Sequence, residues 1–90
     1  MKYDKLFETA KIGSLTLKNR FIMGAMGVGF AEMNGNPTDR TVAYYEERAK
    51  GGYALIITEV TRVQDTEFCT PLEPSLGSDK FIPGWKKVTD

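Results

Sequence analysis

The chain has 90 residues, of which 41% are hydrophobic and 27% are charged, so it can form one small domain or part of a larger one. Its twelve basic and twelve acidic residues cancel. This balance argues against a nucleic-acid or membrane-surface module, because such modules normally carry a basic excess. The sequence has no run of about 18 apolar residues that could span a membrane. A single cysteine, Cys69, cannot form an internal disulfide and fits a reducing, cytoplasmic compartment.

Histidine is absent from the sequence, which has consequences for any enzymatic role. The commonest general base and metal ligand is missing, together with any Ser/His or Cys/His catalytic pair. Cys69 also lacks a basic or histidine neighbour, so we expect an inert thiol there. If the chain belongs to an enzyme, its chemistry comes from a cofactor or from residues outside these 90 positions.

Residues 11–17 are expected to form a tight β-hairpin, because Gly13-Ser14 suits a two-residue type II′ turn and apolar residues flank it on both sides. Residues 21–25 then form the first long-range strand. This strand is uniformly apolar rather than alternating, which is typical of a parallel strand with both faces covered. A loop with Asn-Gly and Asn-Pro turn signals follows it as far as Pro37.

A helix is predicted over residues 38–50, with Thr38 as its N-cap and apolar residues at i, i+3 and i+7 on one face. The Glu of a capping box would stand at position 41. The sequence has Thr41 there, so we expect no capping box. Gly51-Gly52 should end the helix.

Residues 53–58 are aliphatic and bounded by glycine, and they predict a second buried strand that ends at Glu59-Val60. Strand, helix and strand in this order form a βαβ unit, whose crossover should be right-handed. Residues 61–80 lack clear periodicity, and a loop of that length is usually functional or disordered. A last helix should begin near Pro83 and include Trp85.

The predicted fold class is α/β. Two parallel strands leave unpaired edges and cannot shield their own faces. We therefore interpret the βαβ unit as the first part of a repeating β/α fold. A (β/α)8 TIM barrel takes about 250 residues, and residues 1–90 would be roughly its first third. We therefore predict the first βαβ portion of a (β/α)8 TIM barrel, preceded by an N-terminal β-hairpin.

The stretch Met23-Gly24-Ala25-Met26-Gly27-Val28-Gly29 is the leading candidate for a binding site. Ligands of (β/α)8 barrels and of open α/β sheets lie at the C-terminal ends of the strands. The glycines remove side chains where a flat ligand could lie against the backbone, and the methionines add polarizable apolar surface. A plain turn is the alternative. At the end of the second strand, Glu59 is either a catalytic carboxylate or an acceptor for nearby backbone or Arg hydrogen bonds.

Several motifs occur in the same order as in one known family. They are Leu15-Thr16-Leu17-Lys18-Asn19-Arg20, Met23-Gly24-Ala25-Met26-Gly27, Asp39-Arg40, Tyr44-Tyr45-Glu46-Glu47-Arg48-Ala49, Gly51-Gly52 and Ile56-Ile57-Thr58-Glu59. Over residues 6–90 the chain resembles the N-terminus of the Old Yellow Enzyme family, the FMN-dependent NAD(P)H:flavin oxidoreductases. The loop after Met23 is most similar to the branch of the 2,4-dienoyl-CoA reductases and bile-acid-inducible NADH:flavin oxidoreductases.

The resemblance implies a (β/α)8 barrel with FMN lying across the C-terminal ends of its strands, and a hairpin lid that closes the bottom of the barrel. Residues 1–90 would be the N-terminal part of this FMN-binding domain. The implied cofactor-binding residues are Gly24, Ala25, Met26 and Gly27 at the first strand's end, and Val60 or its neighbour Glu59 at the second.

The sequence departs from the family pattern at three places. Many members have Pro where Ala25 stands, one branch has a flavin-tuning Cys where Gly27 stands, and residues 28–30 contain no substrate-facing Tyr. The family's flavin-binding Gln, substrate-orienting His pair, proton donor and phosphate-binding loops correspond to positions beyond Asp90. The cysteines that bind an iron–sulfur cluster in the dienoyl-CoA reductase branch also lie there. The chain would therefore supply one wall of the site.

By resemblance, the parent enzyme passes hydride from NADH or NADPH through FMN to an activated C=C bond of an enoate, enoyl thioester or enone. The branch also implies a 4Fe-4S cluster and FAD in a longer parent. Flavin and a small-molecule substrate would be the partners, with no nucleic acid and no membrane, and the remainder of the barrel or a homo-oligomer would be needed. The alternative is a truncated, catalytically inactive fragment that only self-associates or complements the missing barrel. A stand-alone nucleotide-binding module is disfavoured, because no Gly-x-Gly-x-x-Gly follows a strand.

Overall fold

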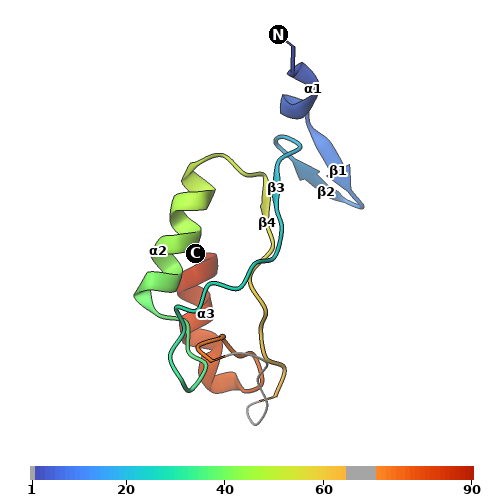
Figure 1. Cartoon of the computed structure of the whole chain (residues 1–90). Coiled ribbons are helices and arrows are strands. Elements are labelled where there is room, and N and C mark those ends of the chain that lie inside the picture. The colour runs from blue at the N-terminus through green and yellow to red at the C-terminus, as the bar shows by residue number, and fades with distance from the viewer. Residues whose placement is uncertain (1, 65–70) are drawn as a thin grey trace.

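The computed structural model describes residues 2–64 and 71–90, and its elements follow the order α1, β1, β2, β3, α2, β4, η1 and α3 (Figure 1). Their bounds are α1 Asp4–Phe7, β1 Ala10–Ile12, β2 Leu15–Leu17, β3 Ile22–Met23, α2 Asp39–Lys50, β4 Leu55–Ile56, the 3-10 turn η1 Asp79–Phe81 and α3 Ile82–Thr89. In these two ranges, no helix has the length and apolar character needed to cross a membrane. Cys69, expected to be inert, lies outside the described residues.

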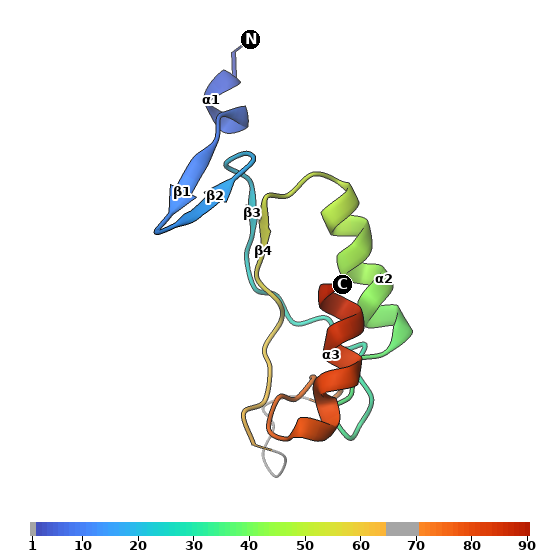
Figure 2. The same ribbon diagram turned by 180° about the vertical axis from the view of Figure 1, so that it is seen from behind.

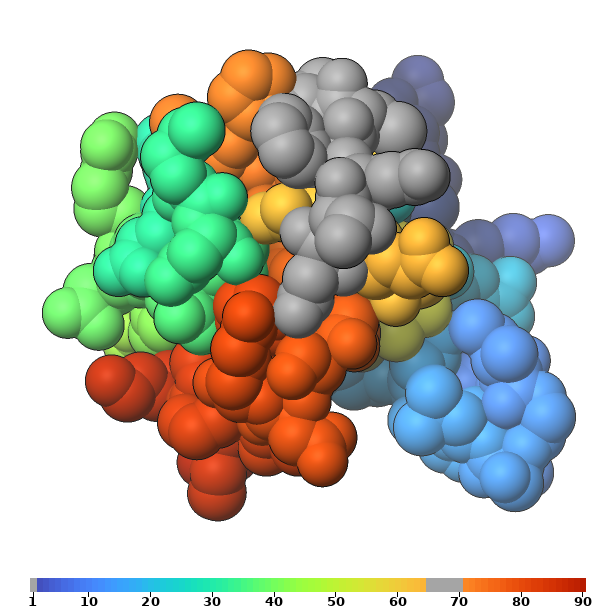
Figure 3. Space-filling model, turned by 90° about the horizontal axis from the view of Figure 1, so that it is seen from below, coloured from blue at the N-terminus to red at the C-terminus, as the bar shows by residue number. Residues whose placement is uncertain are grey.

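The predicted hairpin is present. β1 and β2 pair antiparallel, with Ala10 opposite Leu17 and Ile12 opposite Leu15. Gly13 has a φ of 58°, whereas Ser14 is not among the residues with a positive φ, which is the pattern of a type II′ turn. Figure 1 places the hairpin beyond the N-terminal ends of β3 and β4, away from the loops that follow these strands, and Figure 3 shows it protruding to one side.

The predicted βαβ order is also confirmed, because β3 and β4 pair in parallel, with Ile22 beside Leu55 and Met23 beside Ile56. Further bonds run from Ala54 N to Phe21 O and from Ile57 N to Met23 O, each 3.0 Å long. Both strands are shorter than predicted, because each has a single partner in this sheet. The handedness of the crossover stays a prediction.

The expectation that the strands are covered on both faces is wrong for this chain. The Met23 side chain is 4% exposed, whereas Ile22 is 44% exposed and Ile57 is 48% exposed. Figures 1 and 2 give the reason, because α2 and α3 lie on the same side of the strand pair in both views. The apolar side chains on the uncovered face are therefore left facing solvent.

The helix predicted over residues 38–50 is α2, and the prediction that it lacks a capping box is wrong. Thr38 Oγ1 accepts a hydrogen bond from Thr41 N at 3.3 Å, and Thr38 N donates to Thr41 Oγ1 at 3.1 Å. The Thr41 hydroxyl thus takes the part usually given to a Glu side chain. Thr38 Oγ1 also donates to Phe30 O at 2.6 Å, which ties the start of the helix to the loop after β3.

A buried cluster joins the two loops that follow β3 and β4. Ser75 is fully buried and forms an isolated parallel bridge with Arg62. Its N–H donates to Gly35 O at 2.8 Å, and its carbonyl accepts from Trp85 Nε1 at 2.8 Å. The predicted last helix, α3, starts at Ile82 and brings Trp85 to this cluster. We call Gly35, Arg62, Ser75 and Trp85 the Ser75 cluster.

Replacing Trp85 tests how much the Ser75 cluster contributes to stability. Trp85→Phe keeps an aromatic ring but leaves the buried Ser75 carbonyl without its indole donor, so we expect the free energy of unfolding to fall by about 2 kcal/mol. Urea unfolding followed by circular dichroism measures this change. Tyr53→Phe is the matched control, because Tyr53 is exposed. Equal losses in the two variants would contradict the prediction.

Candidate functional site

The loop that leaves β3 is open on one side. Gly24, Ala25, Met26 and Gly27 are all exposed, and a Cβ built on Gly24 or Gly27 would meet nothing within 4 Å in the part of the chain that the structure describes. Packing within these residues therefore does not require glycine at either position. The open side leaves room for a group that this chain does not contain.

Glu59, directly after β4, is buried beside this loop, and its side chain is 3% exposed. Its Oε2 accepts hydrogen bonds from Val28 N at 2.8 Å and from Gly29 N at 3.4 Å. The sequence left two roles open for Glu59, and the structure shows it as an acceptor of backbone hydrogen bonds. The carboxylate links the ends of the two strands across a separation of about 30 positions in sequence.

The main chain of Glu59 is held from the opposite side. Its N–H donates to the Tyr45 hydroxyl of α2 at 2.8 Å, and its carbonyl accepts from Thr61 Oγ1 at 2.8 Å. Burial raises the pKa of the Tyr45 phenol above its ordinary value of 10.0, and the negative charge of Glu59 raises this pKa further, while the hydrogen bond from Glu59 N partly opposes the shift. Tyr45 therefore stays neutral at physiological pH and accepts this bond.

A cleft of about 300 Å³ lies where these segments meet, and its lining comprises Gly27, Val28, Gly29, Glu59, Val60, Pro71 and Glu73. The structure thus brings together three of the predicted site residues, namely Gly27, Glu59 and Val60. Gly24, Ala25 and Met26 lie along the same loop, closer to β3 and outside this cleft.

Two features of the cleft were not predicted. The sequence allowed Glu59 to accept backbone hydrogen bonds but did not identify the donors, which are the N–H groups of Val28 and Gly29; the small residues of that segment were the only signal for them. The buried Glu73 side chain lies 3.9 Å from Arg62 Nε, and Arg62 Nη2 donates to Glu73 O at 3.2 Å. No periodic pattern marks Glu73, because it comes from the irregular segment between β4 and η1.

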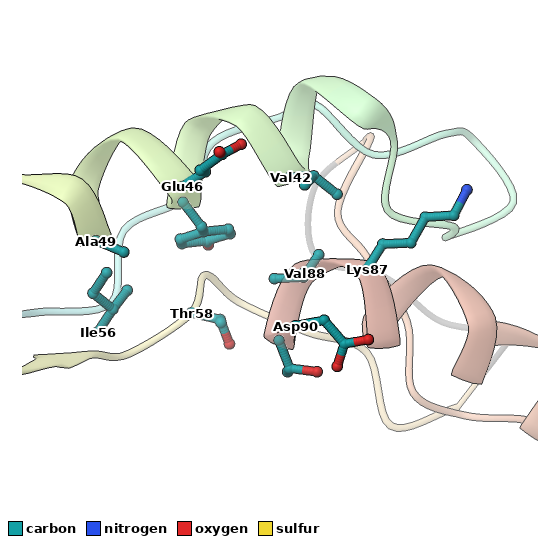
Figure 4. A pocket seen from close by; sticks show the side chains of 10 residues that line it. Val42, Glu46, Ala49, Ile56, Thr58, Lys87, Val88 and Asp90 are labelled. Atoms are coloured by element: carbon teal, nitrogen blue, oxygen red, sulfur yellow. The ribbon is translucent and has the colours of Figure 1, made fainter.

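A larger groove of about 540 Å³ lies elsewhere, between α2, β4 and α3. Figure 4 shows Val42, Ala49, Ile56 and Val88 around it, with charged groups at its edges. Glu46 at its edge already pairs with Lys50 at 2.9 Å. The groove is thus an apolar packing surface, and the candidate site remains at the strand ends. Residues 2–64 and 71–90 contain no group of three or more His, Cys, Asp or Glu side chains that could hold a metal ion.

The pKa of Tyr45 predicts a pH dependence of stability with a definite sign. Its folded pKa lies above the unfolded value of 10.0, so its stabilising contribution is complete below about pH 10 and is lost as pH rises through the folded pKa. We expect the free energy of unfolding to fall from about pH 8 to about pH 11, and to fall less in Tyr45→Phe. Urea unfolding at both pH values measures the difference.

Tyr53→Phe is the control for this measurement, because it removes the hydroxyl of an exposed tyrosine. At neutral pH the Tyr45→Phe variant should also be less stable than the wild type, since Glu59 N loses its acceptor. A wild-type pH profile in Tyr45→Phe would refute the assignment.

Comparison with known proteins places the chain among flavin enzymes. The model of the NADH:flavin oxidoreductase / NADH oxidase family matches residues 5–90. A cinnamate reductase of Clostridium sporogenes is 42% identical over 94 residues, covering 99% of this chain and 14% of the relative. An NADPH dehydrogenase of Listeria monocytogenes serotype 4b is 38% identical over 88 residues, covering 97% of this chain and 26% of the relative.

A solved structure of 2-naphthoyl-CoA reductase with 2-naphthoyl-CoA superposes with a TM-score of 0.93 and 31% identity, covering 98% of this chain and 14% of that one. The chain spans between 12% and 26% of the length of curated relatives that it matches. The matched residues include the βαβ unit, the described linings of the cleft and α3. The chain therefore has the fold of part of a (β/α)8 barrel and belongs to the NADH:flavin oxidoreductase / NADH oxidase family, the family of the Old Yellow Enzymes.

Proposed function

We propose that this chain forms one wall of the FMN site of an enzyme that transfers hydride from NADH or NADPH to an activated C=C bond. The observation that carries the proposal is the cleft at the C-terminal ends of β3 and β4, where Gly27 and Val60 face open space and Glu59 is buried behind them. Parallel-strand enzymes bind their ligands at this end of the sheet. The substrate would be an enoate, enoyl thioester or enone, in line with relatives named for cinnamate and 2-naphthoyl-CoA.

The residues present fit a flat, partly apolar cofactor. FMN, when bound, supplies the hydride chemistry, and the protein supplies position and electrostatics. Gly24 and Gly27 would allow close approach because no side chain projects there, and Ala25 adds only a methyl group. Exposed Met26 and Val60 would provide apolar contact. Glu59 would hold the loop after β3 through the hydrogen bond that it accepts from Val28 N.

The remainder of the barrel would follow Asp90 and complete the domain, with residues 1–90 as roughly its first third. Two uncovered surfaces support this proposal. The groove between α2 and α3 has an apolar lining (Figure 4), and the face of β3 and β4 that is turned away from the helices carries exposed Ile22 and Ile57. The hairpin would close the opposite end of the barrel, because it lies beyond the N-terminal ends of the strands.

We place the parent protein in the branch of the 2,4-dienoyl-CoA reductases, with a 4Fe-4S cluster and FAD bound outside this chain. Support comes from the lengths of its relatives. The chain covers 14% of the cinnamate reductase and 14% of the 2-naphthoyl-CoA reductase, against 26% of the NADPH dehydrogenase. The first two therefore have room for further domains. We also propose a cytoplasmic location for the enzyme, in keeping with the single cysteine of residues 1–90.

Absorption and turnover of the full-length protein test the proposed function. After incubation with FMN and desalting, we expect the protein to retain a flavin band near about 450 nm and to oxidise NADH or NADPH. Addition of cinnamate or cinnamoyl-CoA should increase this oxidation and saturate the substrate's C=C bond, as seen by mass spectrometry. A full-length protein that retains no flavin band would refute the proposed function. The alternative, an inactive fragment that self-associates or complements the missing barrel, would be favoured if only the 90-residue chain is produced and it is colourless.

A pair of glycine variants tests the wall of the site. Gly27→Val fills open space, so it should weaken FMN binding about tenfold while leaving the melting temperature of the flavin-free protein unchanged. Gly35→Ala should instead lower the stability and affect FMN binding less than Gly27→Val does. Gly35 has a φ of 99°, and its Cβ would come within 2.6 Å of Arg62 Nη2 and 2.8 Å of Ser75 Cβ, so about 2 kcal/mol of stability should be lost.

Fluorescence titration of the flavin-free full-length protein gives the FMN dissociation constant, and thermal unfolding gives the stability. Unchanged FMN affinity in Gly27→Val would remove that residue from the site. Gly35 is not part of the cleft lining, so its variant should change FMN affinity less than Gly27→Val does, once allowance is made for the unfolded fraction.

A further inference from the structure

We propose that Glu59 is a positioning residue of the flavin site, which fixes the loop after β3 relative to Val60. This inference rests on the function proposed above. It assigns to Glu59 a role through the protein backbone rather than through the reacting atoms. Three observations carry it: the hydrogen bonds that Oε2 accepts, the hydrogen bonds of the Glu59 main chain, and the burial of Oε1 without a described hydrogen-bond partner.

The hydrogen bonds of Oε2 act on the loop that would face the flavin. Val28 and Gly29, whose N–H groups donate to it, directly follow Gly27 in the chain. A carboxylate that accepts two backbone N–H groups forms charge-assisted hydrogen bonds, which are stronger than neutral ones. Gly29 has a φ of 77°, a backbone conformation that glycine adopts at little steric cost. The loop therefore takes its position from Glu59.

The position of Glu59 is set in turn by the second strand and by α2. The Tyr45 hydroxyl accepts from its N–H, and Thr61 donates to its carbonyl, both at 2.8 Å. Val60 lies between Glu59 and Thr61 in the chain, and its side chain is exposed and lines the cleft. A rigid Glu59 therefore fixes both the Val60 side chain and, through Oε2, the segment after Gly27.

The second carboxylate oxygen is buried without a hydrogen-bond partner among the described residues. Glu59 also forms no ion pair with a described Lys or Arg side chain. Its negative charge is therefore not neutralised by a described cation, and it lies in the wall of the cleft. A negative charge beside bound flavin disfavours the reduced form, which carries more negative charge, so Glu59 should lower the midpoint potential of the flavin.

Two substitutions in the full-length holoenzyme separate the contributions of shape and charge. Glu59→Gln keeps the length of the side chain and one acceptor for Val28 N but removes the charge. Glu59→Ala removes both. The matched control is Glu47→Gln, because Glu47 lies exposed on α2, away from the cleft lining. FMN dissociation constants, flavin midpoint potentials and melting temperatures of the flavin-free proteins are measured for all four proteins.

We expect FMN binding to weaken about tenfold in Glu59→Ala and about threefold in Glu59→Gln, since the charge-assisted bonds to the loop are lost or weakened. The midpoint potential should rise in Glu59→Gln, and Glu47→Gln should match the wild type. A merely structural role would lower the melting temperature without moving the dissociation constant or the potential, and that result would overturn the proposal.

If Glu59→Ala fails to fold, Glu59→Gln decides the question, because its near-identical shape preserves packing. Wild-type FMN affinity and potential in Glu59→Gln would then refute the positioning role. Failure of the proposed function has a different signature, since the wild-type protein itself would bind no FMN.

Discussion

The main-chain hydrogen bonds of Ser75 are the constraint that holds the loops after β3 and β4 together with α3. A long irregular segment can be buried only if its backbone polar groups find partners. Ser75 meets this requirement by donating to Gly35 O and accepting from Trp85 Nε1, while the N–H groups of Arg62 and Leu76 pair across the same bridge with Pro74 O and Arg62 O. Two strand-end loops and α3 are thereby joined at a single buried residue.

The candidate site adjoins this junction, because a residue of the cleft lining contacts the Ser75 cluster. Glu73 lines the cleft and is anchored to Arg62, which belongs to the Ser75 cluster. On the opposite side, Glu59 ties the loop after β3 to the end of β4 and to α2. The cleft lining therefore includes two buried carboxyl side chains: Glu59, bonded to a loop about 30 positions away in sequence, and Glu73, held by Arg62 from the same connecting segment.

Sequence reasoning succeeded where local rules determine the structure. The hairpin follows from Gly13-Ser14, and α2 follows from its N-cap and its terminal glycines. It failed where the outcome depends on contacts distant in sequence. The capping box was missed because a Thr41 hydroxyl does what the usual pattern assigns to Glu. The faces of β3 were misjudged because an apolar strand indicates burial by the complete fold, whereas these described residues cover one face.

The two kinds of glycine in this chain show why the site could be located but not resolved from sequence. Gly35 is required by its own surroundings, since a Cβ would collide with Arg62 and Ser75. Gly24 and Gly27 have no such neighbours among the described residues. In a sequence these three positions look alike, and all suggest turns. The structure separates them, because a glycine that its own chain does not need points to something outside that chain. At the C-terminal ends of parallel strands, where enzymes of this architecture bind their ligands, we propose that this is the cofactor.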